Sequence, residues 1–256
     1  MAGCFKNISL QYLKGAFIMG MEPKYKRVLM KLSGEAISGG KDGVIDFEKM
    51  AGIAEAIKAS VEGGVQIAVV FGAGNIYRGA RGRVVERVTG DSMGMLATVI
   101  NSLALKNALI QAGIGAVVLN SFEVGPVAES YSRDKAVSYM ENGSVVILSG
   151  GTGNPYFSTD TAAMLRAAEI NADVLLMAKN VDGIYTADPN KDKSATRYDV
   201  ITYQEILANE LNAIDLAAAA LGISSKIKTK VFRLNEPKHL YEVMFEDVPG
   251  TDIVAK

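Results

Sequence analysis

Short apolar runs alternate along the chain with longer segments in which apolar residues recur every three or four positions. The short runs are typical of strands buried on both faces, and they span residues 27–32, 66–71, 116–119, 145–148 and 174–177. The longer segments predict helices over residues 47–61, 91–111, 133–141 and 159–171. Strands joined by such helices predict βαβ units and an α/β fold, a three-layer αβα sandwich around a mainly parallel sheet.

The pattern becomes less regular beyond residue 180. A capping box from Thr202 to Glu205 opens one further helix. The other predicted elements are short extended pieces at 184–185 and 198–201, an alanine-rich helix at 216–221, a strand at 230–234, a helix near Leu240 and a strand at 253–255. No linker-like stretch separates these parts, so we expect one domain over residues 24–256 with two lobes, 24–170 and 171–256.

Residues 1–23 are expected to form an extension outside this domain, because the ordered pattern begins near Lys24. Their apolar runs break after four residues or fewer, which is too short for a signal peptide or a membrane span, so we expect a cytoplasmic protein. A flexible extension and a true translation start at Met19 both remain open explanations of this segment.

Composition excludes several kinds of site. The chain has 27 Lys and Arg against 28 Asp and Glu, so no overall positive field attracts nucleic acid or a membrane surface. Cys4 is the only cysteine and His239 the only histidine, which excludes disulfide frameworks, Cys/His zinc sites and Ser-His-Asp or Cys-His catalysis. Chemistry here must depend on Lys, Arg, Asp, backbone N–H groups and at most a metal ion.

Three glycine loops each follow a predicted strand. The first loop is Ser33-Gly34, the second is Gly72 to Asn75, and the third is Gly150 to Asn154. The carboxyl ends of parallel strands share the edge of the sheet where ligands bind, and glycine lets backbone N–H groups reach phosphate oxygens. One such loop alone is often only a tight turn, but three together favour an anionic ligand.

The two common nucleotide fingerprints are absent. The segment from Gly34 to Gly39 is followed by Gly40-Lys41-Asp42, which misplaces the lysine of a P-loop and lacks its hydroxyl. G-x-G-x-x-G fails because Tyr77 and Tyr156 stand where a third glycine belongs. Neither a P-loop enzyme nor a dinucleotide dehydrogenase is favoured.

Three charged residues are candidates for the site, each with a plainer alternative. Lys31, two residues before the first loop, can stabilise a transferring phosphoryl group or can be a surface lysine of an edge strand. Asp160 can orient Lys31 or a metal-bound water, or can be an ordinary acid at a helix N-terminus. By position alone Asp91 is the cap of the longest predicted helix, and only the resemblance described below implies a nucleotide contact there.

A further set of segments carries a family resemblance: Tyr25–Arg27, Lys31–Ala36, Gly74–Gly79, Gly90–Thr98, Gly151–Asp160 and Val181–Pro189. These segments resemble the bacterial uridylate kinases, which belong to the amino acid kinase superfamily. The segments around Asp91 and Asn154 are characteristic of uridylate kinases, whereas the first and last segments are shared more loosely with relatives that phosphorylate amino acids.

This resemblance implies an enzyme that phosphorylates UMP to UDP with ATP and Mg²⁺ in pyrimidine nucleotide biosynthesis. Its implied catalytic residues are Lys31, Arg78 and Asp160, with no residue assigned as a metal ligand. The implied ATP contacts are Lys31, Leu32, Ser33, Gly34, Gly74, Arg78, Lys179, Asn180, Tyr185 and Asp188. The implied UMP contacts are Ala73, Asp91, Thr152, Gly153, Asn154, Pro155, Tyr156, Phe157, Ser158 and Thr159. Lobe 24–170 would then bind UMP and lobe 171–256 ATP.

The resemblance further implies a homohexamer that GTP activates and UTP inhibits. Two features bear on this expectation. The stretch from Arg78 to Asp91 is about two residues shorter than usual, and its Arg81, Arg83 and Arg87 are either solvated or bind an effector or a subunit. The apolar cluster between Met93 and Leu105 is expected to be core or subunit interface rather than ligand pocket.

The chain departs from the family pattern at three other places. Ala73 replaces a glycine: a positive φ there would cost about 1 kcal/mol, whereas a negative φ would only narrow the pocket, and the flanking glycines favour the second. The segment Met177 to Val181 lacks one residue relative to its Gram-positive counterpart, which weakens the assignments of Lys179 and Asn180. Residues 216–228 match poorly in detail.

The chemistry that the resemblance implies needs no histidine. The second pKa of a phosphate monoester is about 6, so UMP already carries an anionic nucleophile at neutral pH. Catalysis then reduces to holding two anions in line while cations and N–H groups neutralise their repulsion. Two alternatives stay open: a related enzyme that phosphorylates a carboxylate or carbamate, and a nucleotide-binding regulator without turnover.

Overall fold

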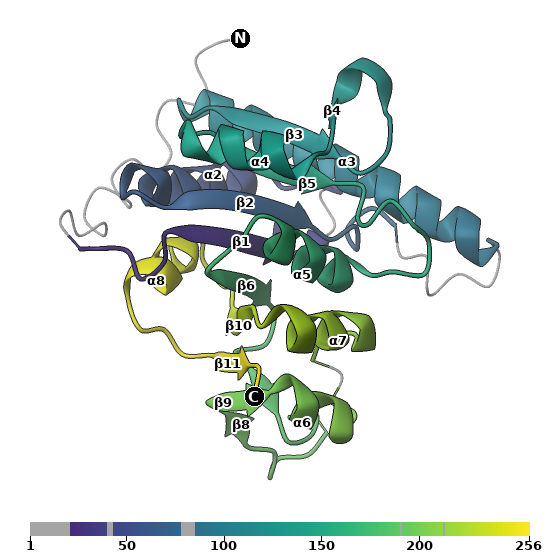
Figure 1. Ribbon diagram of the computed structural model, residues 1–256, viewed down its shortest axis with the longest axis vertical. Helices are drawn as coiled ribbons and strands as arrows, with labels where there is room; N and C mark the ends of the chain where they lie inside the picture. The colour runs from purple at the N-terminus through teal and green to yellow at the C-terminus, as the bar shows by residue number, and fades with distance from the viewer. Residues whose placement is uncertain (1–20, 40–42, 78–84, 190, 212) are drawn as a thin grey trace.

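The computed structural model describes residues 21–39, 43–77, 85–189, 191–211 and 213–256. Within them, a nine-stranded sheet has the order β4-β3-β5-β2-β1-β6-β10-β11-β9 (Figure 1). Neighbouring strands are parallel except for β10 and β11. The strands are β1 Arg27–Leu32, β2 Gln66–Phe71, β3 Ala116–Asn120, β4 Glu129–Ser130, β5 Val145–Ser149, β6 Val174–Lys179, β9 Val200–Thr202, β10 Lys228–Arg233 and β11 Thr251–Val254.

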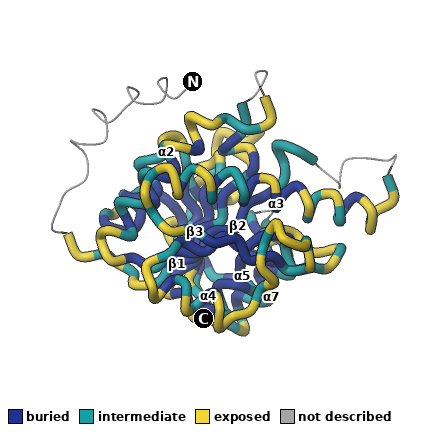
Figure 2. The backbone as a smooth tube through the Cα atoms, turned by 90° about the horizontal axis from the view of Figure 1, so that it is seen from above, coloured by how far each residue is buried: buried dark blue, intermediate teal, exposed yellow. Residues whose placement is uncertain are grey.

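Helices cover both faces of the sheet. One face packs against α2 (Phe47–Glu62), α3 (Arg87–Gln111) and α8 (His239–Phe245). The other packs against α4 (Arg133–Glu141), α5 (Thr159–Glu169), α6 (Tyr203–Ala208) and α7 (Leu216–Ser225). The strands form the buried centre between these layers, as Figure 2 shows. The predicted three-layer α/β fold is confirmed.

Alternate residues of the central strands face alternate helical layers. Val28, Met30 and Leu32 of β1 pack on the side of α2 and α8, whereas Leu29 packs on the side of α5. Burial on both faces explains the continuous apolar run that predicts this strand. Lys31 lies on the same face of β1 as Leu29 and is the charged exception in the strand. Because it is near the carboxyl end of β1, it lies at the edge of the sheet where the parallel strands end.

The predicted elements agree with the structure except at some ends and at 198–201, where the one extended piece expected is two strands, β8 (Arg197–Tyr198) and β9, in different sheets. α3 begins at Arg87, four residues before Asp91, because the Glu86 carboxylate accepts hydrogen bonds from Val88 N and Thr89 N and caps the helix. The interpretation of Asp91 as the cap is therefore wrong. β6 extends to Lys179, two residues beyond its predicted end. The capping box of α6 is confirmed.

Smaller elements flank the sheet, and some of them were not predicted. Sequence periodicity gave no signal for the edge strand β4 or for the short 3-10 helices η1 (Gly34–Ile37) and η4 (Gly125–Val127). The strands β7 (Ile184–Tyr185) and β8 (Arg197–Tyr198) pair with each other in a separate antiparallel hairpin. Among the described helices, α3 alone is long and apolar enough to cross a membrane, and its Leu105 and Leu109 are buried in the core.

Candidate active site

The first and second glycine loops touch at one edge of the sheet. All three glycine loops follow neighbouring strands, β1, β2 and β5. A Cβ atom added to Gly34 would lie 2.8 Å from Gly72 O and 2.8 Å from Gly74 N. Glycine is therefore required at position 34 for close approach, and several peptide groups gather where open α/β sheets bind ligands.

The second loop turns without left-handed backbone. Ala73, Gly72 and Gly74 all lie outside the positive-φ region, and the turn is closed by Ile76 N and Tyr77 N, which both donate to Ala73 O at 2.9 Å. The expectation of a negative φ at Ala73 is confirmed. Its stated reason is wrong, however, because the flanking glycines contribute no unusual angles.

The third loop does need left-handed backbone. Gly150, Gly151 and Gly153 have φ values of 77°, 60° and 81°, which glycine adopts without steric cost. Tyr156, just beyond them, has a φ of 70° and an exposed ring. The loop therefore presents an ordered backbone and an exposed aromatic side chain at the same edge of the sheet.

Lys31, Asp160 and Lys179 form a group of largely buried charges, called here the charge centre. Lys31 Nζ lies 2.9 Å from Asp160 Oδ1, and Lys179 Nζ lies 3.4 Å from Asp160 Oδ2. The side chains of Lys31 and Asp160 are only 11% and 15% exposed. Because β1 lies between β2 and β6, the interpretation of Lys31 as an edge-strand lysine is wrong.

The two lysines keep Asp160 ionised. Burial disfavours its charged form, but the ammonium groups of Lys31 and Lys179 outweigh burial and hold the pKa of this carboxyl group below its ordinary value. For Lys179, burial lowers the pKa of the ammonium group, and Asp160 offsets only part of that effect. A carboxylate with a lowered pKa is suited to anchoring cations rather than to accepting a proton.

Asp160 lies in the first turn of α5, as predicted, but it does not cap the helix. The cap is Ser158, whose hydroxyl accepts hydrogen bonds from Asp160 N at 2.9 Å and Thr161 N at 3.4 Å. The Asp160 side chain is thereby left to pair with the lysines. Thr159 lies beside the second loop, with its hydroxyl 3.7 Å from a Cβ atom placed on Gly72.

Asp215 holds the start of α5 beside the charge centre, and the sequence analysis did not identify it as a site residue. Its carboxylate caps α7 through Ala218 N at 2.8 Å and accepts from the hydroxyls of Ser158 and Thr161 at the start of α5. Lys179 Nζ also donates to Ala213 O in the preceding loop. An aspartate before an alanine-rich helix signals a cap, but nothing in the sequence connects it to residues more than 50 positions away.

Asp91 binds the segment that follows the third loop. Its Oδ2 accepts from Tyr156 N at 2.8 Å and from Arg87 Nε at 2.7 Å, and the Arg87 guanidinium lies 5.2 Å from the centre of the Tyr156 ring. Burial disfavours the charged form of Asp91, but Arg87 and Tyr156 N–H together lower the pKa of its carboxyl group. Arg87 is therefore paired rather than simply solvated.

The predicted ATP contacts beyond the first loop bond to different neighbours. Asn180 Nδ2 donates to Glu35 Oε2 at 2.9 Å, which joins the end of β6 to η1 after the first loop. Tyr185 instead donates to Asp182 Oδ1 at 2.9 Å in the β7–β8 hairpin, and the Asp188 carboxylate lies 3.8 Å from Lys191. Arg78, the third predicted catalytic residue, lies outside the described residues, as do Arg81 and Arg83.

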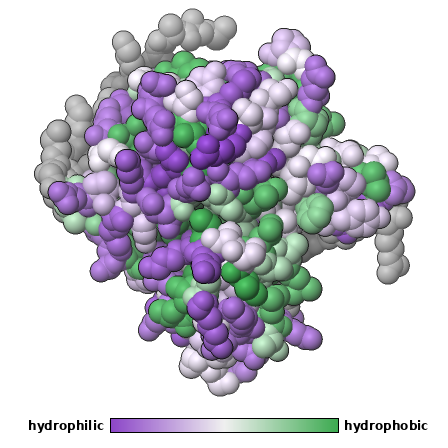
Figure 3. Space-filling view, in the orientation of Figure 1, coloured by the Kyte–Doolittle hydropathy of each residue, from purple (hydrophilic) through white to green (hydrophobic). Residues whose placement is uncertain are grey.

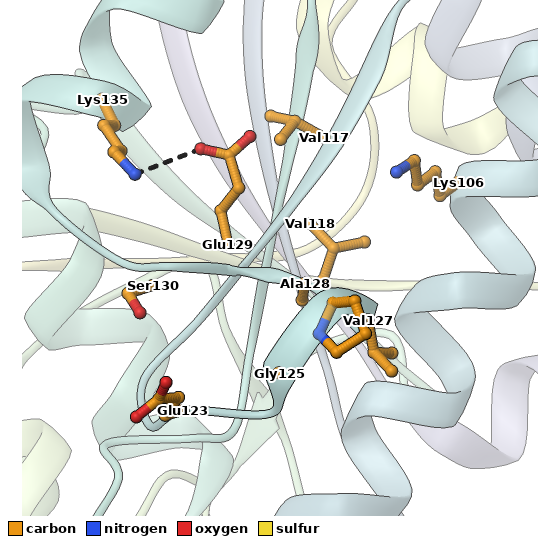
Figure 4. A pocket seen from close by; sticks show the side chains of 11 residues that line it. Lys106, Val117, Val118, Glu123, Gly125, Val127, Ala128, Glu129, Ser130 and Lys135 are labelled. Carbon is orange, nitrogen blue, oxygen red and sulfur yellow. Dashed lines mark hydrogen bonds and ion pairs between the residues drawn. The ribbon is translucent and has the colours of Figure 1, made fainter.

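A cavity of about 350 Å³ lies away from the three glycine loops, at the β3–β4 edge of the sheet (Figure 4). Glu123 and Glu129 balance Lys106 and Lys135 in its lining, and Lys135 pairs with Glu129 at 3.2 Å. A second cavity of about 270 Å³ borders Glu35 and Asn180. On the face of the molecule in Figure 3, hydrophobic residues gather over the lower part, near α7.

Comparison with known proteins agrees with this geometry. Residues 26–233 match the amino acid kinase family. The chain belongs to this family. It is 50% identical over 230 residues to the uridylate kinase of Bacteroides thetaiotaomicron (89% of this chain, 98% of the relative) and 48% identical over 232 residues to that of Klebsiella pneumoniae (90% and 96%).

Solved structures of UMP kinases are similar to this chain as well. The UMP kinase from Bacillus anthracis superposes with a TM-score of 0.85 at 36% identity, covering 90% of this chain and 96% of that one. The UMP kinase from Ureaplasma parvum gives a TM-score of 0.85 at 34% identity, covering 90% and 98%. The resemblance to uridylate kinases is therefore confirmed.

Proposed function

We propose that this protein is a nucleoside monophosphate kinase that transfers the γ-phosphoryl group of ATP to UMP, giving ADP and UDP. One observation carries the proposal: neighbouring glycine loops and the charge centre of Lys31, Asp160 and Lys179 occupy the same edge of the sheet. The uridylate kinases that cover nearly the same length at about half identity support UMP as the acceptor.

In this mechanism a phosphate oxygen of UMP attacks the γ-phosphorus while the bond to the β,γ-bridging oxygen breaks. The nucleophile is anionic at neutral pH, so no side chain needs to remove a proton. Lys31 and Lys179 neutralise charge on the phosphates, and Asp160 holds both ammonium groups in place. The protein therefore contributes position and positive charge rather than acid–base catalysis.

The donor residues proposed are Lys31, Leu32, Ser33, Gly34 and Gly74 for the phosphates of ATP, with Lys179, Asn180, Tyr185 and Asp188 nearby. Arg78 is proposed as a further catalytic cation. The acceptor residues proposed are Ala73, Asp91 and the run from Thr152 to Thr159. This assignment divides the domain into an acceptor lobe (24–170) and an ATP lobe (171–256).

We propose Mg²⁺ as the metal that accompanies ATP. Among the described residues no group of three or more His, Cys, Asp or Glu is placed to hold a metal ion. That composition fits Mg²⁺, which is commonly bound by substrate phosphates and one or two carboxylates. We propose Asp160 as the carboxylate that orients such an ion or its water, and the ion would supply further positive charge.

We also propose a cytoplasmic homohexamer that acts in pyrimidine biosynthesis and responds to GTP as activator and UTP as inhibitor. Support for assembly comes from α3, where Met93, Leu96 and Ile100 expose apolar side chains at helical spacing, whereas Val99 and Leu105 of the same predicted cluster are core. Light scattering with and without GTP and UTP measures the assembly, and a monomer under all conditions would contradict it.

The deciding experiment measures ADP release with UMP, CMP, glutamate or no acceptor. We expect rapid release with UMP only, dependent on Mg²⁺. Preference for glutamate would indicate a kinase of carboxylates, and ATP binding without turnover on any acceptor would indicate a regulator. Equal or faster turnover with CMP would contradict the assignment of UMP as the preferred substrate.

A further inference from the structure

One buried face of α3 contacts two of the glycine loops. Asp91, Thr98 and Asn101 are separated by seven and three positions, which places them within about 80° around the helix axis. Thr98 and Asn101 are 2% and 0% exposed, which is unusual for polar side chains in a helix interior. Each must satisfy its hydrogen-bonding groups inside the protein, and each does so on a loop.

Asn101 holds the second loop. Its Nδ2 donates to Gly72 O and to Asn75 Oδ1, both at 2.9 Å, and its Oδ1 accepts from Asn75 Nδ2 at 3.0 Å. Asn75 Nδ2 also donates to Val44 O at 3.0 Å. The two amides therefore tie the loop after β2 to α3 and to the segment before α2.

Thr98 holds the third loop from the same helix. Its hydroxyl donates to Met95 O at 2.7 Å and accepts from Gly150 N at 2.9 Å. Gly150 begins the run of left-handed residues in that loop, so this single bond anchors its first peptide group. Without the hydroxyl, a buried N–H would lack a partner.

We infer that Thr98 and Asn101 are positioning residues, and that one helix face sets the spacing between the loops that receive the two phosphates. This inference rests on the proposed function, in which the second loop contacts both nucleotides and the third contacts UMP. Substitutions of the two residues should then change different kinetic parameters. Loss of the Thr98 hydroxyl weakens UMP binding, whereas loss of the Asn101 amide misaligns donor and acceptor and lowers kcat.

The test compares Thr98→Val with Ser102→Ala, one turn further along the same helix. Ser102 is equally buried, but its hydroxyl donates to Thr98 O within α3 and contacts no glycine loop. Thr98→Val should raise the KM for UMP about tenfold while the KM for ATP changes less than about twofold. Ser102→Ala should change neither by more than about twofold, and Thr98→Ser should restore the KM for UMP.

Asn101→Ala provides the second arm. It should lower kcat about tenfold or more, with the KM values for UMP and ATP shifted equally or not at all. Unchanged kinetics for Thr98→Val beside an active wild type would overturn the inference, as would equal effects of Thr98→Val and Ser102→Ala. A wild type with no activity on UMP would refute the proposed function, and this inference with it.

Discussion

The glycine loops and the β7–β8 hairpin belong to the same proposed nucleotide site, yet they are held in different ways. Behind the loops lie buried polar side chains, such as Asn101, that bond directly to loop backbone. The hairpin has one such bond at its base, where the buried Thr251 hydroxyl accepts from Ile184 N at 2.8 Å, and beyond it depends on Arg197, whose guanidinium lies 3.3 Å from Asp182 and 3.4 Å from the exposed Asp199. Exposed ion pairs contribute little to stability, whereas buried hydrogen bonds define geometry closely.

This difference follows the chemistry that each region is proposed to perform. The reacting atoms must be aligned closely, because small displacements cost large factors in rate. The distant part of ATP only has to be bound, and a looser contact surface is sufficient for that task. Substitutions near the charge centre should therefore affect turnover strongly, and substitutions in the hairpin should affect ATP binding mildly.

The largest expected effect is that of Lys31→Ala. Loss of a cation at the transferring phosphoryl group should reduce kcat by about 10² to 10⁴, or roughly 3–5 kcal/mol of transition-state stabilisation. Lys230 is the matched control: its side chain is 12% exposed against 11% for Lys31, and it pairs with Asp252 at 3.3 Å. Lys230→Ala should leave kcat unchanged, and a loss below threefold for Lys31→Ala would remove it from the catalytic residues.

Asp160→Asn should be next in size, because it leaves two lysines near each other without their shared partner. We expect the free energy of unfolding at pH 7 to fall by about 3 kcal/mol, as for other broken buried ion pairs, together with a loss of kcat. Chemical denaturation at pH 7 measures the first effect. Equal stability of the variant and the wild type would show that Asp160 does not contribute to the free energy of unfolding.

The same variant makes a prediction about pH. Because the folded-state pKa of Asp160 is lowered, its stabilising contribution is complete above the unfolded-state value of about 3.9 and is lost as the pH falls toward the folded-state value. Wild-type stability should therefore decline more steeply on acidification below about pH 5 than that of Asp160→Asn. Parallel stability curves for the two proteins would contradict the lowered pKa.

Tyr185→Ala tests the looser region. It should raise the KM for ATP about fivefold, which corresponds to one contact of about 1 kcal/mol, and leave the KM for UMP unchanged. Tyr185→Phe removes only the hydroxyl that bonds Asp182 and keeps the ring, so it should behave like the wild type. An effect of Tyr185→Ala on the KM for UMP would show that the two regions are not separate.

The smallest effect is expected for Ala73→Gly. Because φ is already negative at Ala73, glycine relieves no strain and should lower stability by less than about 1 kcal/mol, through the freer unfolded chain. Turnover of UMP should stay within about threefold. A variant that is clearly more stable, or tenfold more active, would show that the methyl group obstructs the second loop.

The sequence predicted those parts of the site that depend on local pattern. A buried apolar run followed by glycine identified each loop, and Lys31 was singled out because it interrupts such a run. The start of α3 was missed because Glu86 caps it, whereas helix caps are more often Ser, Thr, Asp or Asn.

The contacts that hold the site together could not be predicted from the sequence. Thr98 lies 52 positions from its partner Gly150, and Asn101 lies 29 positions from Gly72. Sequence periodicity does not distinguish a polar helix residue that faces a loop from one that faces solvent. The role of such a residue can be recognised only when the sheet order is known. Whether β1 is an edge strand or a central strand also becomes known only with the sheet order, and it decides between the two interpretations of Lys31.

The double role of Asp215 has a consequence for how this protein can change by mutation. One carboxylate caps α7 and also receives the hydroxyls of Ser158 and Thr161 that begin α5. A substitution there weakens two helix starts at once, so a second mutation that repairs one helix leaves the other unrepaired. Genetic selection for recovery should therefore yield true revertants at position 215 much more often than suppressors elsewhere. Where a side chain has one partner, a second mutation can replace the lost contact. At position 215 only aspartate restores both contacts, so a substitution there is difficult to compensate elsewhere.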